Sequence, residues 1–574
     1  MAKHNSKKNL RNSLLILCLS LGSPAWAAKQ ADPLQYWKKL LHFGETHSQV
    51  ISQDFFLAKN GNADPDAELA HTIQLLNSPQ GRTIACRFPA RYQWIRQTQK
   101  AVPQYDLHQC REIQKFKQSF QHQTLKLVFA SEYLNKPVSS FGHTLLVFYD
   151  EDKPLLSADT IHFAAETQAD DGFLTYTWKG FTGGYQGYFH RDPFFKKQLQ
   201  YTIQEQRYIH LYTLDFNKQQ IEKIIHHLYE LRNARFKYYY VNQNCAYQIA
   251  NLLDIASDDI SFSSDGFVLP IDVIKRYKTQ YTRHTVLQPV TRKIQFLLKD
   301  MPERDLGQFE QVLAGELDPD NTLPNHVKQV LYLYYDHAYR SQRIKHPNYQ
   351  KVLRLKYQRE KLDIPSPQPM DKPGAHRISI GHLKQDGQES ALLSYRPVLQ
   401  GLRDTLITEQ QDFELSLFQP MVRIQDNTSY LHQFDFINLK SFPTRSYLYK
   451  PLSWQFYTGF NRNNLKQSLN YETEFGLGLS YQLSLFSMNY SINIGSDLSL
   501  GDYYYKPNIT ALLRLGDNFK IGIEASEKYY EHHQFITRSG FVSFTTGNHG
   551  LTLEYSQLPH LEQESMNLSY HYYF

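Results

Sequence analysis

One cysteine has the sequence surroundings of a nucleophile. Asn242 or Asn244 can cap a helix that begins at Cys245. We therefore expect the sulfur in the first helical turn, where N–H groups and the helix dipole stabilise a thiolate. The same N–H groups, around Asn244 and Ala246, can bind a developing oxyanion. The apolar residues that follow at helical spacing are Ile249, Leu252 and Leu253.

A histidine at the start of an earlier apolar run is the best candidate for a base. A thiol needs a base to act as a nucleophile. His143 opens a run of strand length, where a polar ring is costly unless it has a partner. Gly142 leaves room for a close approach, and Ser140 lies just before it. The next strand supplies His162 to orient the His143 ring, with Asp159 as the weaker candidate.

Each of these residues also has an ordinary structural interpretation. Cysteine is among the most buried residue types, and a lone histidine at the start of a strand is usually a hydrogen-bonded core residue. Together the two residues favour a catalytic site over a structural role, because an unpaired cysteine at a helix start follows a histidine on an earlier strand.

The N-terminus has the pattern of a secretory signal. A short apolar run from Leu14 to Leu21 precedes Ala25-Trp26-Ala27, a small-x-small cleavage pattern. Leu17 stands before Cys18 where a lipoprotein signal needs a small residue, so we expect no lipid there. We predict that residues 1–27 are a signal peptide, cleaved near Ala27. The basic residues that open it are Lys3, Lys7, Lys8 and Arg11.

Export constrains the three cysteines that remain after cleavage. In an oxidising compartment a pair should close, and Cys86 and Cys110 lie only 24 positions apart. Closing that loop would stabilise the fold by about 3–4 kcal/mol. Cys245 is left as a free thiol, which needs a functional reason in such a compartment.

The remaining chain divides into five regions. We predict a helical region at 28–85, an α+β region at 86–280, a helical extension at 281–363, a proline-rich linker at 364–376 and a β-rich region at 377–574. Within the second region, strands are expected over 125–130, 142–149 and 157–165, and a helix over 217–232.

The β-rich region has the pattern of an antiparallel outer-membrane barrel. About twelve segments of roughly ten residues alternate between apolar and polar side chains. In one of them Phe486, Met488, Tyr490, Ile492 and Ile494 alternate with Ser487, Asn489, Ser491 and Asn493. The alternation points apolar side chains to lipid and polar ones to the lumen. A soluble β-sandwich is the alternative.

The last strand favours the membrane barrel over the sandwich. Apolar residues occupy every second position and the chain ends on an aromatic residue, which resembles the signal read by the outer-membrane assembly machinery. With an even number of strands, the chain enters and leaves the barrel on the same side. We expect this side to be the periplasm, which places the N-terminal half of the chain there too. The residues are Met566, Leu568, Tyr570, Tyr572 and Phe574.

Several motifs resemble the Lnb N-terminal periplasmic domain family. They are Ser140-x-Gly142-His143-Thr144, Phe163-Ala164-Ala165, Gly183-Gly184-Tyr185-Gln186-Gly187-Tyr188-Phe189, Asn244-Cys245-x-x-Gln248 and Cys86-Arg87-Phe88-Pro89-Ala90-Arg91. The resemblance covers roughly residues 33–290. It implies a circularly permuted papain-like α+β fold, with Cys245 as nucleophile and His143 as general base. The family carries Asn rather than His before Phe-Ala-Ala, so the resemblance does not extend to His162.

The function expected is thiol acyl transfer in the periplasm, on a lipoprotein, phospholipid or peptidoglycan substrate. N-acylation of lipoproteins is implied by the resemblance alone. The alternatives are a cysteine amidase or peptidase acting on peptidoglycan, and a non-catalytic outer-membrane channel or assembly factor. The net charge of +6 is not concentrated in a basic tract, so no nucleic-acid binding is expected. The histidines lack metal-ligand spacing, so we expect no metal and no cofactor.

Overall fold

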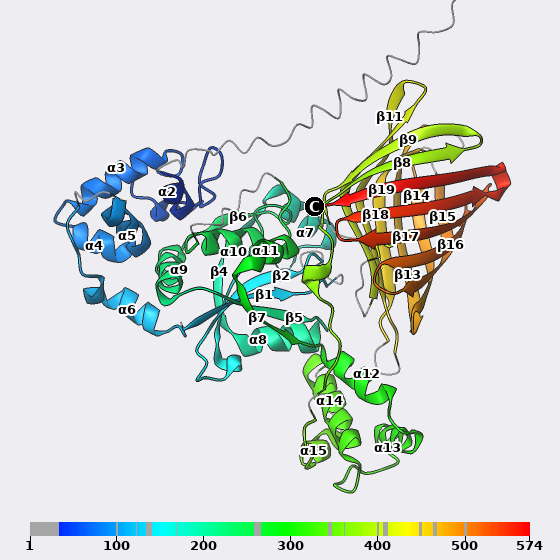
Figure 1. Cartoon of the computed structure of the whole chain (residues 1–574), viewed down its shortest axis with the longest axis horizontal. Helices are drawn as coiled ribbons and strands as arrows, with labels where there is room; N and C mark the ends of the chain where they lie inside the picture. The colour runs from blue at the N-terminus through cyan, green and yellow to red at the C-terminus, as the bar shows by residue number, and fades with distance from the viewer. Residues whose placement is uncertain are drawn as a thin grey trace, which may run out of the picture. The chain divides into compact units, whose positions relative to one another are not determined.

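The computed structural model describes residues 34–574 apart from short gaps (Figure 1). The chain divides into two compact units, Met1–Tyr105 and Asp106–Phe574. The predicted signal peptide, with Cys18, lies outside the described residues. The gaps are residues 99–101, 122, 134–139, 169, 258–265, 343–346, 361, 399–400, 406–410, 447–449, 463–467 and 499–501.

The N-terminal unit is helical. The Asp64 side chain caps α3, and Arg91 forms a fully buried ion pair with Glu68 at 3.2 Å. Helical structure continues to Thr98, beyond the end predicted at residue 85. The helices are α2 (Gln35–Leu40), η1 (Gln53–Phe55), α3 (Pro65–Leu76), α4 (Gly81–Arg87) and α5 (Pro89–Thr98).

The second unit begins with a seven-stranded sheet in a domain of residues 106–287, called here the Cys/His domain. The strand order is β6-β4-β3-β2-β1-β5-β7, and all neighbouring pairs are antiparallel. The strands are β1 (Thr124–Ala130), β2 (His143–Tyr149), β3 (Asp159–Glu166), β4 (Tyr185–Pro193), β5 (Ile209–Leu214), β6 (Phe236–Tyr238) and β7 (Tyr281–Leu287). The α+β class and the three predicted strands are confirmed; the permuted papain-like arrangement stays a prediction.

Helices accompany this sheet. The predicted helix over 217–232 is α9, which Asn217 and Gln220 close with a capping box. The helices are η2 (Leu107–Gln109), α6 (Arg111–Gln118), η4 (Leu155–Ser157), α7 (Phe173–Thr182), α8 (Phe194–Gln198), η5 (Leu199–Gln204), α9 (Lys218–Leu231), α10 (Cys245–Asp254), α11 (Pro270–Arg276) and η6 (Lys278–Gln280). Side chains from α8 and η5 join a buried cluster with β1, β2 and β5, while α10 packs on β2 and β3.

The predicted helical extension begins later than expected. Residues 281–287 form β7, the edge strand beside β5, because Tyr281, Thr285 and Val286 suit a strand better than a helix. The extension itself contains α12 (Val290–Lys299), α13 (Glu303–Ala314), α14 (Asn325–Gln342) and α15 (Pro347–Leu353), and the linker holds η7 (Pro369–Asp371). None of the helices in the described residues has the length and apolar character needed to cross a bilayer.

The C-terminal region is a closed barrel of twelve antiparallel strands, as predicted. Its order runs from β10 to β19 and closes through β8 and β9. The strands are β8 (Arg377–Gln385), β9 (Gln388–Arg396), β10 (Gln411–Gln425), β11 (Thr428–Pro443), β12 (Ser453–Arg462), β13 (Leu469–Leu483), β14 (Phe486–Asp497), β15 (Asp502–Leu515), β16 (Phe519–Tyr529), β17 (Gln534–Thr546), β18 (His549–Leu558) and β19 (Gln563–Tyr573), with η8 (Pro559–Leu561) between the last two.

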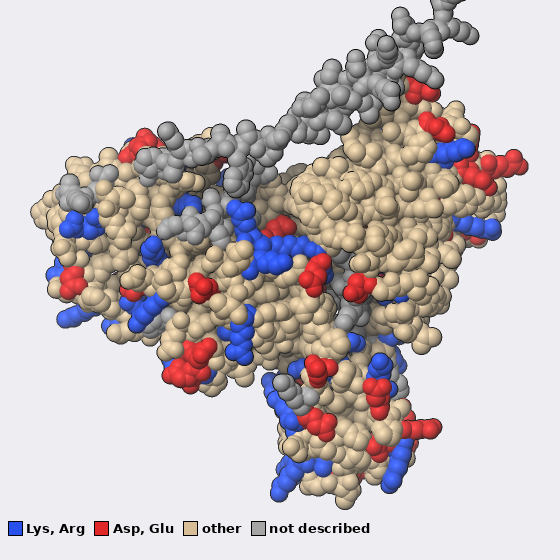
Figure 2. Space-filling model, viewed as in Figure 1, with Lys and Arg blue, Asp and Glu red and all other residues tan. Residues whose placement is uncertain are grey.

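The barrel has its apolar side chains outside and its polar ones inside. On β14, Tyr490 and Ile492 are 50% and 54% exposed, whereas Asn489 and Ser491 are each 2% exposed. Few charged side chains interrupt the barrel wall that faces the viewer in Figure 2. Tyr570, Tyr572 and Phe574 also point outward; their use as an assembly signal stays a prediction. This inverted pattern suits a lipid environment and not a soluble sandwich.

A segment between β9 and β10 enters the barrel lumen. The Leu402 carbonyl accepts a hydrogen bond from Lys520 on β16 (3.1 Å). Asp404 pairs with Arg377 on β8 (3.0 Å) and Arg396 on β9 (2.6 Å), and accepts a hydrogen bond from the Tyr573 hydroxyl on β19 (2.7 Å). A short segment that meets inward-facing side chains of four strands lies inside the barrel.

The Cys/His domain packs against the outside of β10 and β11. Outward residues of β10, such as Leu415 and Leu417, are buried with Phe141 and Leu269 of the domain. Lys275 on α11 adds hydrogen bonds to the carbonyls of Lys372 and Pro373 in the linker. The second unit therefore holds the sheet and the barrel together through an apolar contact.

Candidate active site

The start of α10 lies where the central sheet separates. Strands β2 and β3 pair only as far as Leu145 and His162, and β3 then continues beside β4 alone. The Thr144 N–H, the next in β2, donates to the Cys245 sulfur. The thiol therefore lies against the peptide that directly follows His143.

Asn244 fixes the start of this helix, as one of the two predicted caps. Its Oδ1 accepts the N–H groups of Ala246 (3.0 Å) and Tyr247 (3.2 Å). Its Nδ2 donates to the carbonyls of Tyr240 (3.0 Å) and Val268 (2.7 Å). The side chain is buried and its hydrogen-bonding groups are occupied. The Ala246 N–H thus serves the cap in this structure; the oxyanion role of Asn244 and Ala246 stays a prediction.

Gly142 determines where His143 enters β2. Gly142 has φ +87°, and a Cβ there would lie 2.7 Å from the Phe129 ring and 3.0 Å from the Ala130 carbonyl oxygen. Glycine is the residue that accepts both the left-handed backbone and the close ring. Ser140 is buried just before it. His143 then faces His162 and Tyr201, with ring centroids at 6.1 and 6.3 Å.

His162 lies beside His143 but does not hydrogen-bond to it. The two rings meet edge to face, while His162 Nε2 lies 3.0 Å from Lys197 Nζ. His162 also stacks on His190 at 5.1 Å. Its Nδ1 is buried and has no hydrogen-bond partner among the described residues. His162 thus borders the site, and its predicted orienting bond is not formed.

Asp159 is too far along the sheet to orient His143, which corrects the second candidate. It pairs in register with Phe148, five residues beyond His143 and about 16 Å away at strand spacing. Its carboxylate instead binds the Arg191 guanidinium at 2.7 and 2.9 Å. The antiparallel register that brings His162 close necessarily carries Asp159 away.

Burial keeps both groups of the pair neutral. Burial raises the pKa of Cys245 to about 11, against the opposing effect of the N–H donors and the Arg207 charge. Burial also lowers the pKa of His143 well below its usual range, and His162, Lys197 and Arg207 act in the same direction. The sequence predicts a thiolate stabilised by the helix start, whereas burial in the structure favours the neutral thiol of Cys245 and the neutral imidazole of His143.

Three residues of the site were missed by sequence reasoning. Arg207 is buried, pairs with Glu205 at 2.9 Å and lies 4.7 Å from the Tyr201 ring centroid. Lys197 is 9% exposed and lies 3.5 Å from Asp192. Lys197 lies on α8, Tyr201 on η5 and Arg207 just before β5, and only the sheet order brings these three residues to His143. An Arg and a Lys within six residues of a tyrosine were the one signal in the sequence.

The cysteine chemistry agrees with the sequence. Cys86 and Cys110 are disulfide-bonded and Cys245 is a free, buried thiol. Within the described part of the chain, no group of three or more His, Cys, Asp or Glu side chains could hold a metal ion.

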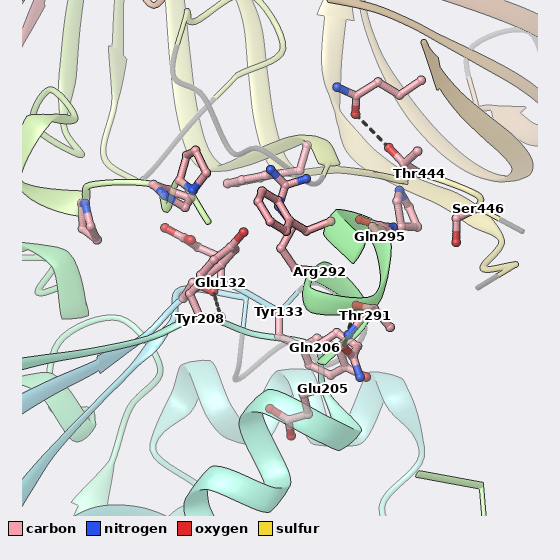
Figure 3. A pocket seen from close by; sticks show the side chains of 18 of the residues that line it. Glu132, Tyr133, Glu205, Gln206, Tyr208, Thr291, Arg292, Gln295, Thr444 and Ser446 are labelled. Carbon is pink, nitrogen blue, oxygen red and sulfur yellow. Dashed lines mark hydrogen bonds between the residues drawn. The ribbon is translucent and has the colours of Figure 1, made fainter. Parts of the chain in front are cut away.

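A cavity of about 660 Å³ lies beside the site but does not contain the pair. Figure 3 shows Thr291, Arg292 and Gln295 of α12 on one side and Glu132, Tyr133 and Tyr208 on another. Cys245 and His143 are absent from its lining. Glu205 lines the cavity and pairs with Arg207 near the thiol, which connects the two.

Three family models match consecutive parts of the chain. The Lnb N-terminal periplasmic domain matches residues 112–280. Two domains of unknown function, DUF7843 and DUF7840, match residues 30–98 and 367–573. No curated protein matches the chain.

Solved structures similar to this chain are outer-membrane barrels. The KdgM porin has 13% identity and a TM-score of 0.23, over 34% of this chain and 99% of the porin. A channel from Pseudomonas putida F1 has 10% identity and a TM-score of 0.24, over 35% and 96%. Omp33 from Acinetobacter baumannii has 7% identity and a TM-score of 0.21, over 35% and 99%.

The family match and the barrel's own inverted polarity together give the location. The first names a periplasmic domain, and the second requires lipid around the barrel wall. Residues 112–280 match the Lnb N-terminal periplasmic domain, and the chain has its C-terminal barrel in the outer membrane and its N-terminal domain in the periplasm.

Proposed function

We propose that this protein is a periplasmic thiol acyltransferase in which Cys245 is the nucleophile and His143 the general base. The observation that supports it most is the position of a free thiol in the first turn of α10, against the peptide after His143. A buried structural cysteine would have no need of an imidazole on the adjoining strand.

The neutral pair suits general-base catalysis. A ring nitrogen of His143 takes the thiol proton as the sulfur attacks an ester or amide carbonyl carbon. The carbonyl oxygen becomes an oxyanion, and its collapse breaks the bond to the leaving group, which takes the proton from the imidazolium. An acyl group remains on sulfur as a thioester. An amine acceptor then attacks this carbonyl, His143 removes its proton, and the thiol is released.

The acyl donor proposed is a lipid and the acceptor an amine of an envelope component. A lipid donor fits a domain that packs on the wall of an outer-membrane barrel. Lipoprotein N-acylation is the activity that the resemblance of the sequence motifs around His143 and Cys245 implies. Hydrolysis differs only in that water replaces the amine, so a peptidoglycan amidase uses the same two residues.

Intact-protein mass spectrometry tests the proposal. The full chain is incubated with phosphatidylethanolamine vesicles, and a mass increase of one acyl chain is expected on Cys245, removable by hydroxylamine as a thioester. Cys245→Ala should carry no adduct and His143→Ala should form it slowly. A folded protein that never acquires an adduct contradicts acyl transfer. Release of stem peptides from sacculi, lost in Cys245→Ala, would identify the amidase instead.

The barrel supports an anchoring role in this proposal. The segment around Leu402 and Asp404 occupies part of the lumen, and Arg514 and Lys520 pair with Asp412 across the inner wall. A conducting channel is the second candidate. It predicts permeability that is unchanged in Cys245→Ala and His143→Ala alike.

A further inference from the structure

Helix α7 has an exposed tryptophan beside the barrel wall. Trp178 is 71% exposed, which is unusual for the largest apolar side chain. One turn later, Phe181 contacts the Phe418 ring of β10, with centroids 5.5 Å apart. Figure 1 places α7 beside the barrel. The exposed indole therefore lies on a helix that touches the outer surface of a membrane barrel.

The contact with Phe418 lies at the level where the barrel wall becomes free. Below it, outward Leu417 is 3% exposed because the Cys/His domain covers it; above it, Ile424 is 43% exposed. Strand β9 pairs with β10 only over Met421–Ile424, so Phe418 lies just below the rim of this part of the barrel. The wall above the rim faces lipid, and α7 lies at the border.

The backbone at Phe418 is arranged for this contact. Its φ is +49°, in the left-handed region that a bulky residue rarely adopts. The ring also meets Phe267, at 6.4 Å between centroids. A strained residue that joins two segments of the Cys/His domain to β10 fixes the height of α7 on the barrel.

The helix carries no unpaired charge that would oppose lipid contact. Lys179 is the one ionisable side chain of α7 that is charged at neutral pH, and it binds Asp171 at 2.8 Å and Gln168 at 3.1 Å. The other residues of α7 are aromatic, aliphatic, Thr or Gly. Tryptophan is enriched at membrane–water interfaces because its ring is apolar and its N–H needs a polar partner.

We propose that α7 is a membrane-interface anchor, in which Trp178 inserts into the phospholipid head-group region of the periplasmic leaflet beside β10. The anchor would hold the nucleophile helix at a fixed height above the bilayer. The Gly180 carbonyl accepts the Tyr240 N–H (2.9 Å), and the Tyr240 carbonyl accepts Asn244 Nδ2 (3.0 Å). Two hydrogen bonds thus join α7 to the cap of α10. The inference rests on the outer-membrane location and not on the proposed acyl transfer.

Tryptophan quenching tests the anchor. The full chain is reconstituted in phosphatidylcholine vesicles whose acyl chains are brominated near the head group. Quenching should be strong in the native chain, clearly reduced in Trp178→Phe, and retained in the matched control Trp94→Phe, which lies on α5. Equal quenching in the native chain and Trp178→Phe would overturn the proposal. A heat-modifiable gel shift shows that each variant has a folded barrel.

Spin labelling gives a second readout that does not depend on the other tryptophans. In a Cys245→Ala background, Trp178→Cys and Leu156→Cys are labelled with a nitroxide. Leu156 is 50% exposed on η4, at the opposite end of β3 from the barrel contact. Collision with oxygen should exceed collision with a water-soluble nickel complex at position 178, and the order should reverse at position 156. A water-accessible label at both positions contradicts the anchor.

Discussion

The neutral state of the Cys245 thiol gives a prediction that can be worked out in numbers. Burial raises the pKa of Cys245 from 9.0 to about 11. At pH 7 the thiolate fraction is then about 10⁻⁴, against about 10⁻² for an exposed thiol, which corresponds to about 2.7 kcal/mol. Alkylation of the free protein should therefore be about a hundredfold slower than that of the unfolded chain at pH 7.

The pH dependence separates this effect from simple shielding. The rate of alkylation by iodoacetamide is followed by mass spectrometry between pH 5 and 10, with the chain in guanidinium as control. Cys86 and Cys110 do not interfere because they are disulfide-bonded. The folded protein should show a rate that rises about tenfold per pH unit up to pH 10. A plateau between pH 5 and 8 would mean a thiolate–imidazolium pair and would refute the neutral pair.

Three further predictions follow from the same contacts. Gly142→Ala should abolish acyl-enzyme formation and destabilise the domain by at least 1–2 kcal/mol, because φ is +87° and the new Cβ meets Phe129; a native melting temperature with full activity would contradict this. His162 and His210 have pKa values of about 3 through burial, so the unfolded chain binds their protons first and stability is lost below pH 6.5. Urea unfolding followed by near-ultraviolet circular dichroism should show that each histidine lowers the free energy of unfolding by about 2 kcal/mol between pH 6.5 and 4.5. Equal stability at the two pH values would contradict this prediction. Asp404→Ala, which removes both arginine pairs, should raise single-channel conductance in planar bilayers; an unchanged conductance would show that the inserted segment is held in other ways.

Local pattern was enough for the elements that carry the pair. The choice of Asn242 or Asn244 as the cap, with the apolar spacing after Cys245, predicted the start of α10, and the alternation around Tyr490 predicted the inverted polarity of β14. These features depend on residues close in sequence. The prediction of one disulfide and one free thiol at Cys245 needed only the count of cysteines and an exported location.

The pairing register of distant strands determines which side chains lie near His143, and this register could not be predicted from the sequence. Asp159 and His162 are three residues apart, but the antiparallel pairing with β2 leaves only His162 near His143. Lys197 and Arg207 lie near His143 because β5 lies beside β1 and because α8 packs with β1, β2 and β5 in one buried cluster. The position of Cys245 at a helix start predicts a lowered pKa, but burial raises the pKa of this thiol, and burial depends on the whole packed domain.

A double-mutant cycle on Cys245 and His143 tests the central claim most directly. The rate of acyl transfer from phosphatidylethanolamine to an added amine acceptor, including the residual background rate, is compared in the native chain, Cys245→Ala, His143→Ala and the double variant. Two residues that act as one unit should be non-additive: each single change should cost about 10²–10⁴-fold or more, and the second change should cost little further. Multiplicative losses, or a His143→Ala rate equal to that of the native chain, would show that the thiol and the imidazole do not work together.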